Sequence, residues 1–332
     1  MSNPMVTILM ATYNPNLVWL REQLVSINNQ TYGNIELVLC DDCSTTIDEE
    51  QIDTILKQHI TRFSYMFMRN ETNQGTNETF ERLTLIASQS CRRSQHSEES
   101  YLAFCDQDDI WEHHKIETLM NSIIQKSAVL AYSDMSIIDG EGNYVSDSIT
   151  KVRKRFEYFE GNELWRKILV RNFISGCCMI IRTDIAKAAV PFEPGMKHDR
   201  WISVVASING YIAYVDEPLV IYRQHGKNQT GVLKDITDKQ TYIDVRLKDH
   251  LQMLQSIRTR TEENTEIRQF LDDYIEQVGT RCRYAEGKIP ALFKMISYLK
   301  YNKPTILFEI IAFKMPNRLF KKIIQVIINK NL

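Results

Sequence analysis

Short apolar runs alternate with helix-spaced apolar positions over the first 105 residues. The first run, residues 6–10, is rich in β-branched residues and ends before Asn14-Pro15, so it predicts a strand. The next apolar residues, from Leu17 to Ile27, recur every three or four positions and predict a helix. This alternation predicts a mostly parallel sheet with helices on both faces. It continues with predicted strands at 35–40, 63–68 and 101–105 and predicted helices at 47–59 and 76–87.

After residue 105, predicted strands and helices no longer alternate regularly. After about residue 230, the spacing of apolar residues predicts helices only. Residues 88–100 are polar and predict an exposed loop, and the Asp-Gly-Glu-Gly at 139–142 is typical of a hairpin turn. We therefore expect an α/β region at 1–230, with halves 1–112 and 113–230, and an all-helical extension at 231–332. The later predicted strands cover 129–132, 177–181, 212–215 and 219–222, and the later predicted helices cover 115–126, 162–170, 184–189, 199–208, 235–258 and 263–278.

Three carboxylates follow the predicted strand 101–105. Asp106, Asp108 and Asp109 would repel one another there unless they take up protons or bind a cation. Mg²⁺ and Mn²⁺ prefer such oxygen ligands and leave positions open for substrate phosphates. On an extended backbone Asp106 and Asp108 point to the same side, so they form the expected ligand pair, and Asp109 supports the following turn. A solvated acidic turn or a helix N-cap is the alternative interpretation.

Polar residues also follow the other predicted strands. Tyr13 lies after the first strand and could stack on a base, whereas Asp42 lies after the second and could accept hydrogen bonds from a base or ribose. Gly75, after the third strand, would let a ligand approach the backbone closely. Each residue also has a structural interpretation, as an edge aromatic or as part of an ordinary turn. Because parallel strands end at one sheet edge, where ligands bind in open α/β sheets, the combination favours a ligand site.

Composition and charge narrow the class of protein. The chain is 43% hydrophobic and 25% charged, which excludes a disordered or low-complexity protein. The net charge of −2 gives no reason to expect a nucleic-acid partner. Residues 281–332 nevertheless hold eleven Lys and Arg against two Glu. This basic, apolar-striped tail predicts either a helix on an anionic membrane surface or a helical cap with a solvated basic face.

Sequence features also indicate a location. No run of about 18 apolar residues is present, and no basic stretch precedes an apolar core near Met1, so we expect neither a membrane span nor a secretory signal. The seven cysteines, an odd number, are typical of free thiols in a reducing compartment. The expected location is the cytoplasm, either free or at the inner face of the cell membrane.

Seven short motifs occur in order along the chain. They are VTILMATYN at 6–14, ELVLCDDCS at 36–44, NQG at 73–75, FCDQDDIW at 104–111, SGC at 175–177, KHDRW at 197–201 and YRQHG at 222–226. The first four resemble the nucleotide-sugar half of family 2 glycosyltransferases with the GT-A fold. The last three resemble the acceptor half of the bacterial rhamnosyltransferase-like branch of that family. The resemblance covers about residues 5–230 and implies a GT-A-type mixed sheet with a Rossmann-like nucleotide-binding half.

The resemblance implies a role for each matching residue on the donor side. A metal, Mn²⁺ or Mg²⁺, would be held by Asp106 and Asp108, with Asp108 the more direct ligand. His225 stands where the family places a residue that contacts the metal or the diphosphate. The residues implied in binding the nucleotide sugar are Ala11, Tyr13, Asp42, Gly75 and Asp106.

On the acceptor side, Asp199 matches the general base of the family. Taken alone, Asp199 could equally cap the helix that follows it. Gly176, Cys177 and Trp201 are expected to line the acceptor pocket. The chain departs from the family at Cys43, where glycine is frequent, and at His198, where glutamate often precedes the base.

The resemblance therefore implies an inverting, metal-dependent glycosyltransferase. The Gln-x-x-Arg-Trp motif of processive synthases is absent from the sequence, so transfer of a single sugar is expected. The expected donor is dTDP-rhamnose or a UDP-hexose, and the expected acceptor is a glycan or lipid-linked oligosaccharide in bacterial surface polysaccharide biosynthesis. The alternatives are another metal-dependent phosphate-processing enzyme, such as a phosphatase or nucleotidyltransferase, and a non-catalytic nucleotide-binding scaffold.

Overall fold

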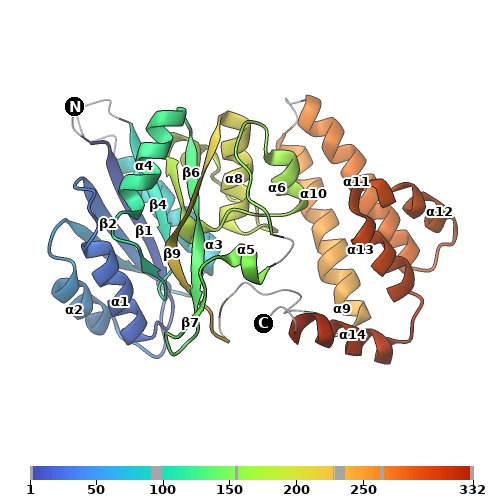
Figure 1. Ribbon diagram of the computed structural model, residues 1–332, viewed down its shortest axis with the longest axis horizontal. Coiled ribbons are helices and arrows are strands. Elements are labelled where there is room, and N and C mark those ends of the chain that lie inside the picture. The colour runs from blue at the N-terminus through green and yellow to red at the C-terminus, as the bar shows by residue number, and fades with distance from the viewer. Residues whose placement is uncertain are drawn as a thin grey trace. The chain divides into compact units, whose positions relative to one another are not determined.

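The computed structural model describes residues 3–90, 99–153, 156–226, 228, 236–261 and 265–329 (Figure 1). The chain divides into two compact units. The first comprises Met1–Phe192 with Met196–Gly226, and the second comprises Glu193–Gly195 with Lys227–Leu332.

A mixed β-sheet forms the centre of the first unit. Among the described residues it has nine strands, eight of them in the order β3-β2-β1-β4-β8-β6-β9-β5, while β7 pairs with β6. Strands β3, β2, β1 and β4 are parallel, whereas β8 is antiparallel to both β4 and β6. The strands are β1 Met5–Thr12, β2 Ile35–Asp41, β3 Tyr65–Arg69, β4 Ser100–Cys105, β5 Ile110–Trp111, β6 Leu130–Ile138, β7 Tyr144–Ser146, β8 Met179–Arg182 and β9 Ile212–Arg223.

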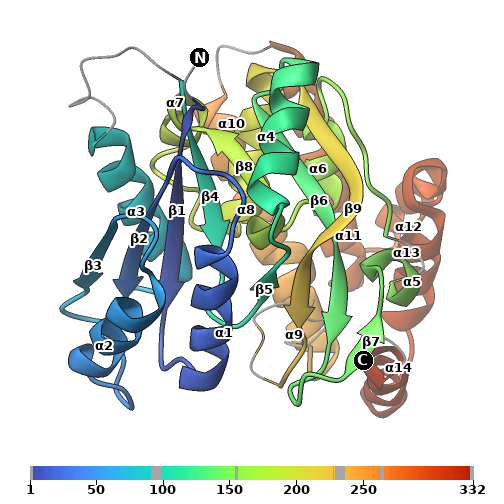
Figure 2. The same cartoon turned by 60° about the vertical axis from the view of Figure 1, so that its left-hand side comes forward.

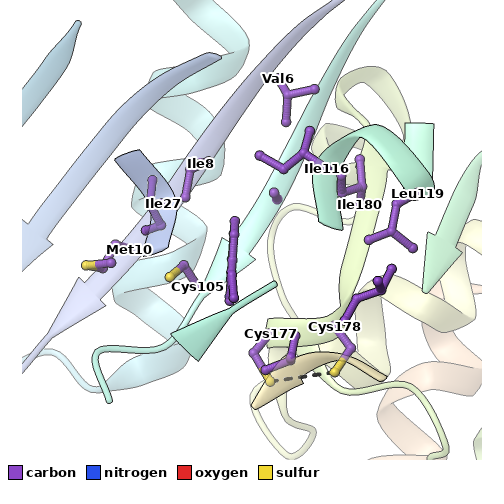
Figure 3. Close-up of a cluster of buried hydrophobic side chains, with 14 of the residues drawn as sticks. Val6, Ile8, Met10, Ile27, Cys105, Ile116, Leu119, Cys177, Cys178 and Ile180 are labelled. Carbon is purple, nitrogen blue, oxygen red and sulfur yellow. Dashed lines mark hydrogen bonds between the residues drawn. The ribbon is translucent and has the colours of Figure 1, made fainter. Parts of the chain in front are cut away.

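Helices cover the sheet because alternate strand residues point to opposite faces. Val6, Ile8 and Met10 of β1 belong to one buried cluster with Ile27 of α1 and Leu119 of α4 (Figure 3). Helices α1 and α4 accordingly lie on the same side of the sheet (Figure 2). The helices of this unit are α1 Leu17–Asn28, α2 Glu49–His59, α3 Thr76–Ser90, α4 Lys115–Lys126, α5 Ile149–Val152, α6 Trp165–Val170, α7 Thr183–Ala188 and α8 His198–Asn209.

The structure confirms the predicted mixed α/β sheet, but several elements differ locally. The strand predicted at 129–132 extends to Ile138 as β6, and β5 and β7 were not predicted. The strand predicted at 177–181 begins later, because Gly176–Cys178 form a 3₁₀ turn before β8. The two strands predicted at 212–215 and 219–222 are one strand, β9, which pairs with β6 along its length through a register shift between Val215 and Pro218. The predicted loop at 88–100 falls mostly on residues 91–98, which lie outside the described residues.

The second unit is helical. A buried ion pair between Arg281 Nη2 and Glu309 Oε1 joins α11 to α13, and the hydroxyl of Tyr242 on α9 donates to Glu309 at 2.9 Å. No helix in the described parts of the chain has both the length and the apolar character needed to cross a bilayer. The helices are α9 Lys239–Ile243, the π-helical turn Asp244–Lys248, α10 Asp249–Arg260, α11 Thr265–Ala285, α12 Pro290–Ser297, α13 Leu299–Ala312 and α14 Asn317–Asn329.

Candidate functional site

The loops that follow β1, β2 and β4 are joined at the carboxyl edge of the parallel strands. The backbone N–H of Tyr13 donates to Gln107 Oε1 at 2.8 Å, which ties the β1 loop to the β4 loop. The N–H of Asp42 donates to the carbonyl of Thr12 at 2.7 Å. The Tyr13 side chain is 44% exposed at this edge. The structure thus brings together the strand-end residues that the sequence placed on three separate loops.

Asp42 organises the loop after β3. Its Oδ1 accepts from the N–H of Gln74, and its Oδ2 accepts from the N–H of Gly75, both at 2.8 Å. Asn70 Nδ2 also donates to Oδ1, at 2.7 Å. Gly75 has a φ of +93°, which a residue with a side chain rarely adopts. Asp42 is buried, and both of its carboxylate oxygens are used within the protein to hold this loop. Ala11 is half-buried near the end of β1.

The acidic segment Asp106–Asp109, which follows β4, lies beside His225, which follows the end of β9. His225 Nε2 lies 2.8 Å from Asp108 Oδ2. Burial and the neighbouring Asp108 raise the pKa of Asp106 to about 7. Burial, together with Asp106 and Asp108, raises the pKa of Asp109 well above its usual range. Ionising these carboxylates therefore costs free energy, because they are buried and repel one another. A bound cation would offset this cost.

The donor set fits a divalent cation. Asp109 Oδ2 is buried and has no hydrogen-bond partner, and one ligand atom each from Asp106, Asp109 and Cys177 lie within 4.8 Å of one another. Asp108 Oδ2 and His225 Nε2 form a second pair of possible ligands, in contact with each other at 2.8 Å and outside that group of three. Carboxylates and one imidazole suit Mn²⁺ or Mg²⁺, of which Mn²⁺ accepts the nitrogen ligand more readily.

Arg223 fixes this acidic segment, although its role was not apparent from the sequence. Its backbone N–H donates to Asp109 Oδ1 at 3.1 Å, and its Nε donates to the carbonyl of Asp108 at 3.0 Å. Its Nη2 donates to Glu22 of α1 at 2.6 Å. Trp19, also on α1, packs against the His225 ring with the ring centroids 4.8 Å apart. Helix α1 therefore contacts Arg223 and His225, which adjoin the carboxylates expected to hold a metal, from a part of the sequence with no motif of its own.

Asp199 is not the cap of its helix. Lys197 occupies the N-cap position of α8, and Asp199 is the second helical residue. Its Oδ2 accepts from the N–H of Gly176 at 3.3 Å, and its Oδ1 accepts from the N–H of Arg200 at 2.6 Å. The charge of Asp199 contributes to the raised pKa of Asp106. The carboxylate matched to the general base thus lies within electrostatic reach of the acidic segment.

Asn77 holds the start of α8 and was also missed from the sequence. Its Nδ2 donates to the carbonyl of Met196 at 2.7 Å, and its Oδ1 accepts from the N–H of His198 at 2.9 Å. Asn77 lies in the first turn of α3, two residues after Gly75. It therefore connects the loop organised by Asp42 to the helix that carries Asp199.

The residues expected to line an acceptor pocket are buried. Trp201 is 4% exposed, and its Nε1 donates to the carbonyl of Ala189 at 2.7 Å. A Cβ on Gly176 would lie 2.9 Å from His198 Nε2, so glycine allows the turn to approach α8. Gly176, Cys177 and Trp201 thus lie in the core, and the N–H of Gly176 donates to Asp199.

His198 should make stability depend on pH. Burial between Phe80 and Phe104 lowers the pKa of its imidazole to about 4. The unfolded chain, with a histidine pKa near 6.5, binds a proton as the pH falls below 6.5, so the folded state loses up to about 3 kcal/mol by pH 4. We expect His198→Phe to remove about 2 kcal/mol of the loss between pH 7 and pH 5, measured by urea denaturation. His59→Phe, at the end of α2, is the control and should retain the slope; an unchanged slope in His198→Phe would contradict the assignment.

Comparisons with known proteins identify the family of this chain. A sequence model of the family described as Glycosyl transferase family 2 matches residues 7–188, more than half of the chain. The chain is 29% identical over 166 residues to an uncharacterized glycosyltransferase of Haemophilus influenzae, which covers 49% of this chain and 60% of that relative. It is 26% identical over 239 residues to the dTDP-rhamnosyl transferase RfbG of Shigella flexneri, with 67% and 73% covered.

Two further matches are a curated glucosyltransferase and a solved structure. The chain is 24% identical over 214 residues to the UDP-Glc:alpha-D-GlcNAc-diphosphoundecaprenol beta-1,3-glucosyltransferase WfgD of Escherichia coli, covering 63% of this chain and 73% of the relative. The crystal structure of S. aureus TarS 1-349 in complex with UDP-GlcNAc has a TM-score of 0.52 and 17% identity, covering 75% of this chain and 66% of that one. This likeness shows a common fold. From the extent of the family match, together with the strand-end site, the chain belongs to glycosyl transferase family 2.

Proposed function

We propose that the protein is an inverting, metal-dependent, non-processive glycosyltransferase of bacterial surface polysaccharide biosynthesis. It moves one sugar from a nucleoside-diphosphate sugar to a hydroxyl of a glycan or lipid-linked oligosaccharide. The observation that carries the proposal is that the carboxylates expected to hold a metal and the carboxylate expected to act as general base lie near one another at one edge of the sheet. Asp108 contacts His225 at 2.8 Å, and the nearby Asp106 interacts electrostatically with Asp199.

The reaction would proceed by direct displacement. The acceptor oxygen attacks the anomeric carbon and forms the new C–O bond, Asp199 takes the hydroxyl proton, and the bond to the diphosphate breaks with its electron pair leaving on the phosphate oxygen. One displacement inverts the anomeric centre. A divalent cation held by Asp108, Asp106 and His225 would supply positive charge beside the departing diphosphate. Tyr13 and the loop organised by Asp42 would hold the nucleotide.

The donor is either dTDP-rhamnose or a UDP-hexose. Support for the first comes from the named activity of RfbG and support for the second from that of WfgD. A thermal-shift panel of dTDP, UDP and GDP, each with and without Mn²⁺, tests the proposal. We expect one nucleotide to stabilise the protein more in Mn²⁺ than in EDTA. The matching nucleotide sugar should then release nucleoside diphosphate when a glycan acceptor is present.

The same assays separate the alternatives. Hydrolysis of a phosphomonoester without sugar transfer would indicate a phosphatase, and stabilisation by a nucleoside diphosphate with no turnover on any acceptor would indicate a binding scaffold. Either result would overturn the proposed transfer reaction.

We further propose that the helical unit attaches the protein to the inner face of the cell membrane, where a lipid-linked acceptor would be met. Ile289, Phe293 and Ile296 are 66%, 73% and 49% exposed at i, i+4 and i+7 spacing, so they form one apolar face at α12. Exposed Lys288 precedes this face. In α14, Phe320 and Ile324 are buried within the unit, whereas Leu319, Val326, Lys321 and Lys322 are exposed, so α14 supplies both basic charge and further exposed apolar side chains.

Phe293→Asp should weaken binding to vesicles of phosphatidylglycerol and phosphatidylcholine by about tenfold or more, because burying a Phe side chain contributes about 1.5–3 kcal/mol. Co-sedimentation measures the effect. Tyr144→Asp, which alters a 68% exposed aromatic of the first unit, is the matched control and should bind like the parent. Equal binding by Phe293→Asp and the parent would exclude the α12 face as the contact.

A further inference from the structure

A second cluster of metal-ligating side chains lies directly before α4, outside the site at the carboxyl edge of the sheet. One ligand atom each from Glu112, His113 and His114 lie within 4.8 Å of one another. Glu112 and His114 are half-buried and His113 is exposed, so an ion can reach the cluster from solvent. The two imidazole rings are in contact, with their centroids 4.7 Å apart. Two imidazoles beside one carboxylate are a donor set that suits Zn²⁺.

His114 is held in the form that a metal ligand requires. Its Nε2 lies 2.7 Å from Oε1 of Glu217 on β9. Because a carboxylate accepts and does not donate, Nε2 of the neutral ring carries the proton, and the free lone pair is on Nδ1. This Nδ1 is buried, and among the described residues it has no hydrogen-bond partner. A histidine that binds a metal through one ring nitrogen usually donates to a carboxylate or carbonyl through the other, which fixes the tautomer and the ring.

The backbone that carries the cluster is fixed by three other segments. The N–H of Glu112 donates to the carbonyl of Leu219 on β9 at 3.1 Å. The carbonyl of Glu112 accepts from Gln30 Nε2 at 2.8 Å, and the carbonyl of His113 accepts from the N–H of Thr31 at 2.8 Å. Binding of an ion would therefore order only the side chains, which keeps the entropy cost of binding small.

This cluster is separate from the acidic segment expected to hold Mn²⁺ or Mg²⁺. Both adjoin β9, but Asp109 is bonded to the N–H of Arg223, whereas the N–H of Glu112 is bonded to Leu219. Four residues of extended strand separate these two contacts by about 13 Å. The acidic segment is also dominated by carboxylates, whereas the cluster before α4 has two imidazoles. The two places therefore favour ions of different chemistry.

We propose that Glu112, His113 and His114 bind one Zn²⁺ ion, with His114 binding through Nδ1 and water completing the coordination. Glu217 supports the site by accepting the Nε2 proton of His114, so the ion would strengthen the connection between β9 and the start of α4. The competing explanation is that His114 and Glu217 form only a partly exposed contact between these elements, without a metal. None of the ligands belongs to the residues assigned to sugar transfer, so the site does not depend on the proposed function.

Counting the Zn²⁺ ions bound to the full chain tests the site. After equilibrium dialysis at micromolar free Zn²⁺, elemental analysis should find one ion fewer per chain in His113→Ala than in the parent. Because the His113 side chain is exposed, this variant should fold as the parent does. His59→Ala, which alters a histidine at the end of α2, is the matched control and should bind as many ions as the parent. Equal numbers in His113→Ala and the parent would overturn the proposal.

Glu217→Gln tests the role of the tautomer. The glutamine amide can donate to Nε2 of His114, which would place the ring proton on Nδ1. Zn²⁺ should therefore bind about 10–100-fold more weakly, measured by competition with a chelating dye. Asp216→Asn removes the same charge from the neighbouring exposed residue and should bind Zn²⁺ like the parent. Unchanged affinity in Glu217→Gln would overturn the binding through Nδ1.

The response to Mn²⁺ shows whether the two sites are separate. His113→Ala leaves the acidic segment intact, so it should keep the shift in melting temperature that Mn²⁺ produces in the parent. Loss of this shift together with the Zn²⁺ ion would indicate one shared site and overturn the proposal. Failure of the parent itself to respond to Mn²⁺ would count against the proposed function alone, and the number of bound Zn²⁺ ions would still decide the site before α4.

Discussion

Replacing Asp108 with alanine is expected to abolish the Mn²⁺-dependent part of the stabilisation by nucleoside diphosphate. Asp108 Oδ2 is the carboxylate oxygen in contact with His225, so the variant loses one of the two donors that already face each other. If the variant weakens metal binding by about 100-fold, a ligand at 100 times its dissociation constant contributes only about 0.4 kcal/mol instead of about 2.7 kcal/mol. Thermal shift with and without Mn²⁺ measures the difference.

Asp147→Ala provides the control for this experiment. Asp147 is an exposed carboxylate that precedes α5 and forms an ion pair with Lys151 of that helix at 2.6 Å. The control should keep the full Mn²⁺ response, since it removes the same charge elsewhere. If Asp108→Ala responded to Mn²⁺ as the parent does, Asp108 would not be a metal ligand.

Asp199→Asn should lower turnover by about 10²–10⁴-fold, which is the usual contribution of a general base. Asparagine has nearly the same shape, and its single amide oxygen can keep one of the two hydrogen bonds that Asp199 accepts from the N–H groups of Gly176 and Arg200. The loss should therefore appear in kcat, with little change in nucleotide affinity. Release of nucleoside diphosphate in the presence of acceptor reports turnover, and thermal shift reports binding.

Asp184→Asn is the matched control for the base. Asp184 lies in the first turn of another helix, α7, where it forms an exposed ion pair with Arg182. It should retain full turnover. Turnover within a few-fold of the parent in Asp199→Asn would assign the proton transfer to another group.

Most strands of the sheet could be predicted because each of them is marked by its own short stretch of sequence. Strands buried on both faces read as continuous apolar runs, as in β1 and β4, and each ends where polar residues begin. The ends of β9 were predicted but its continuity was not. Asp216 and Glu217 interrupt the apolar run, and only pairing with β6 on either side shows that they are a bulge within one strand.

The sequence by itself determined which residues can carry the chemistry. Asp106, Asp108 and Asp42 are recognisable because each follows an apolar run, and the edge of a parallel sheet collects strand ends. Tertiary structure alone decided what supports them. Arg223 and Asn77 act through backbone carbonyls and N–H groups of segments distant in the sequence. Arg223 lies in one of the seven motifs, but neither motif nor periodicity indicated these contacts, because a hydrogen bond to a main-chain atom depends on where two segments meet rather than on which side chain the second segment carries.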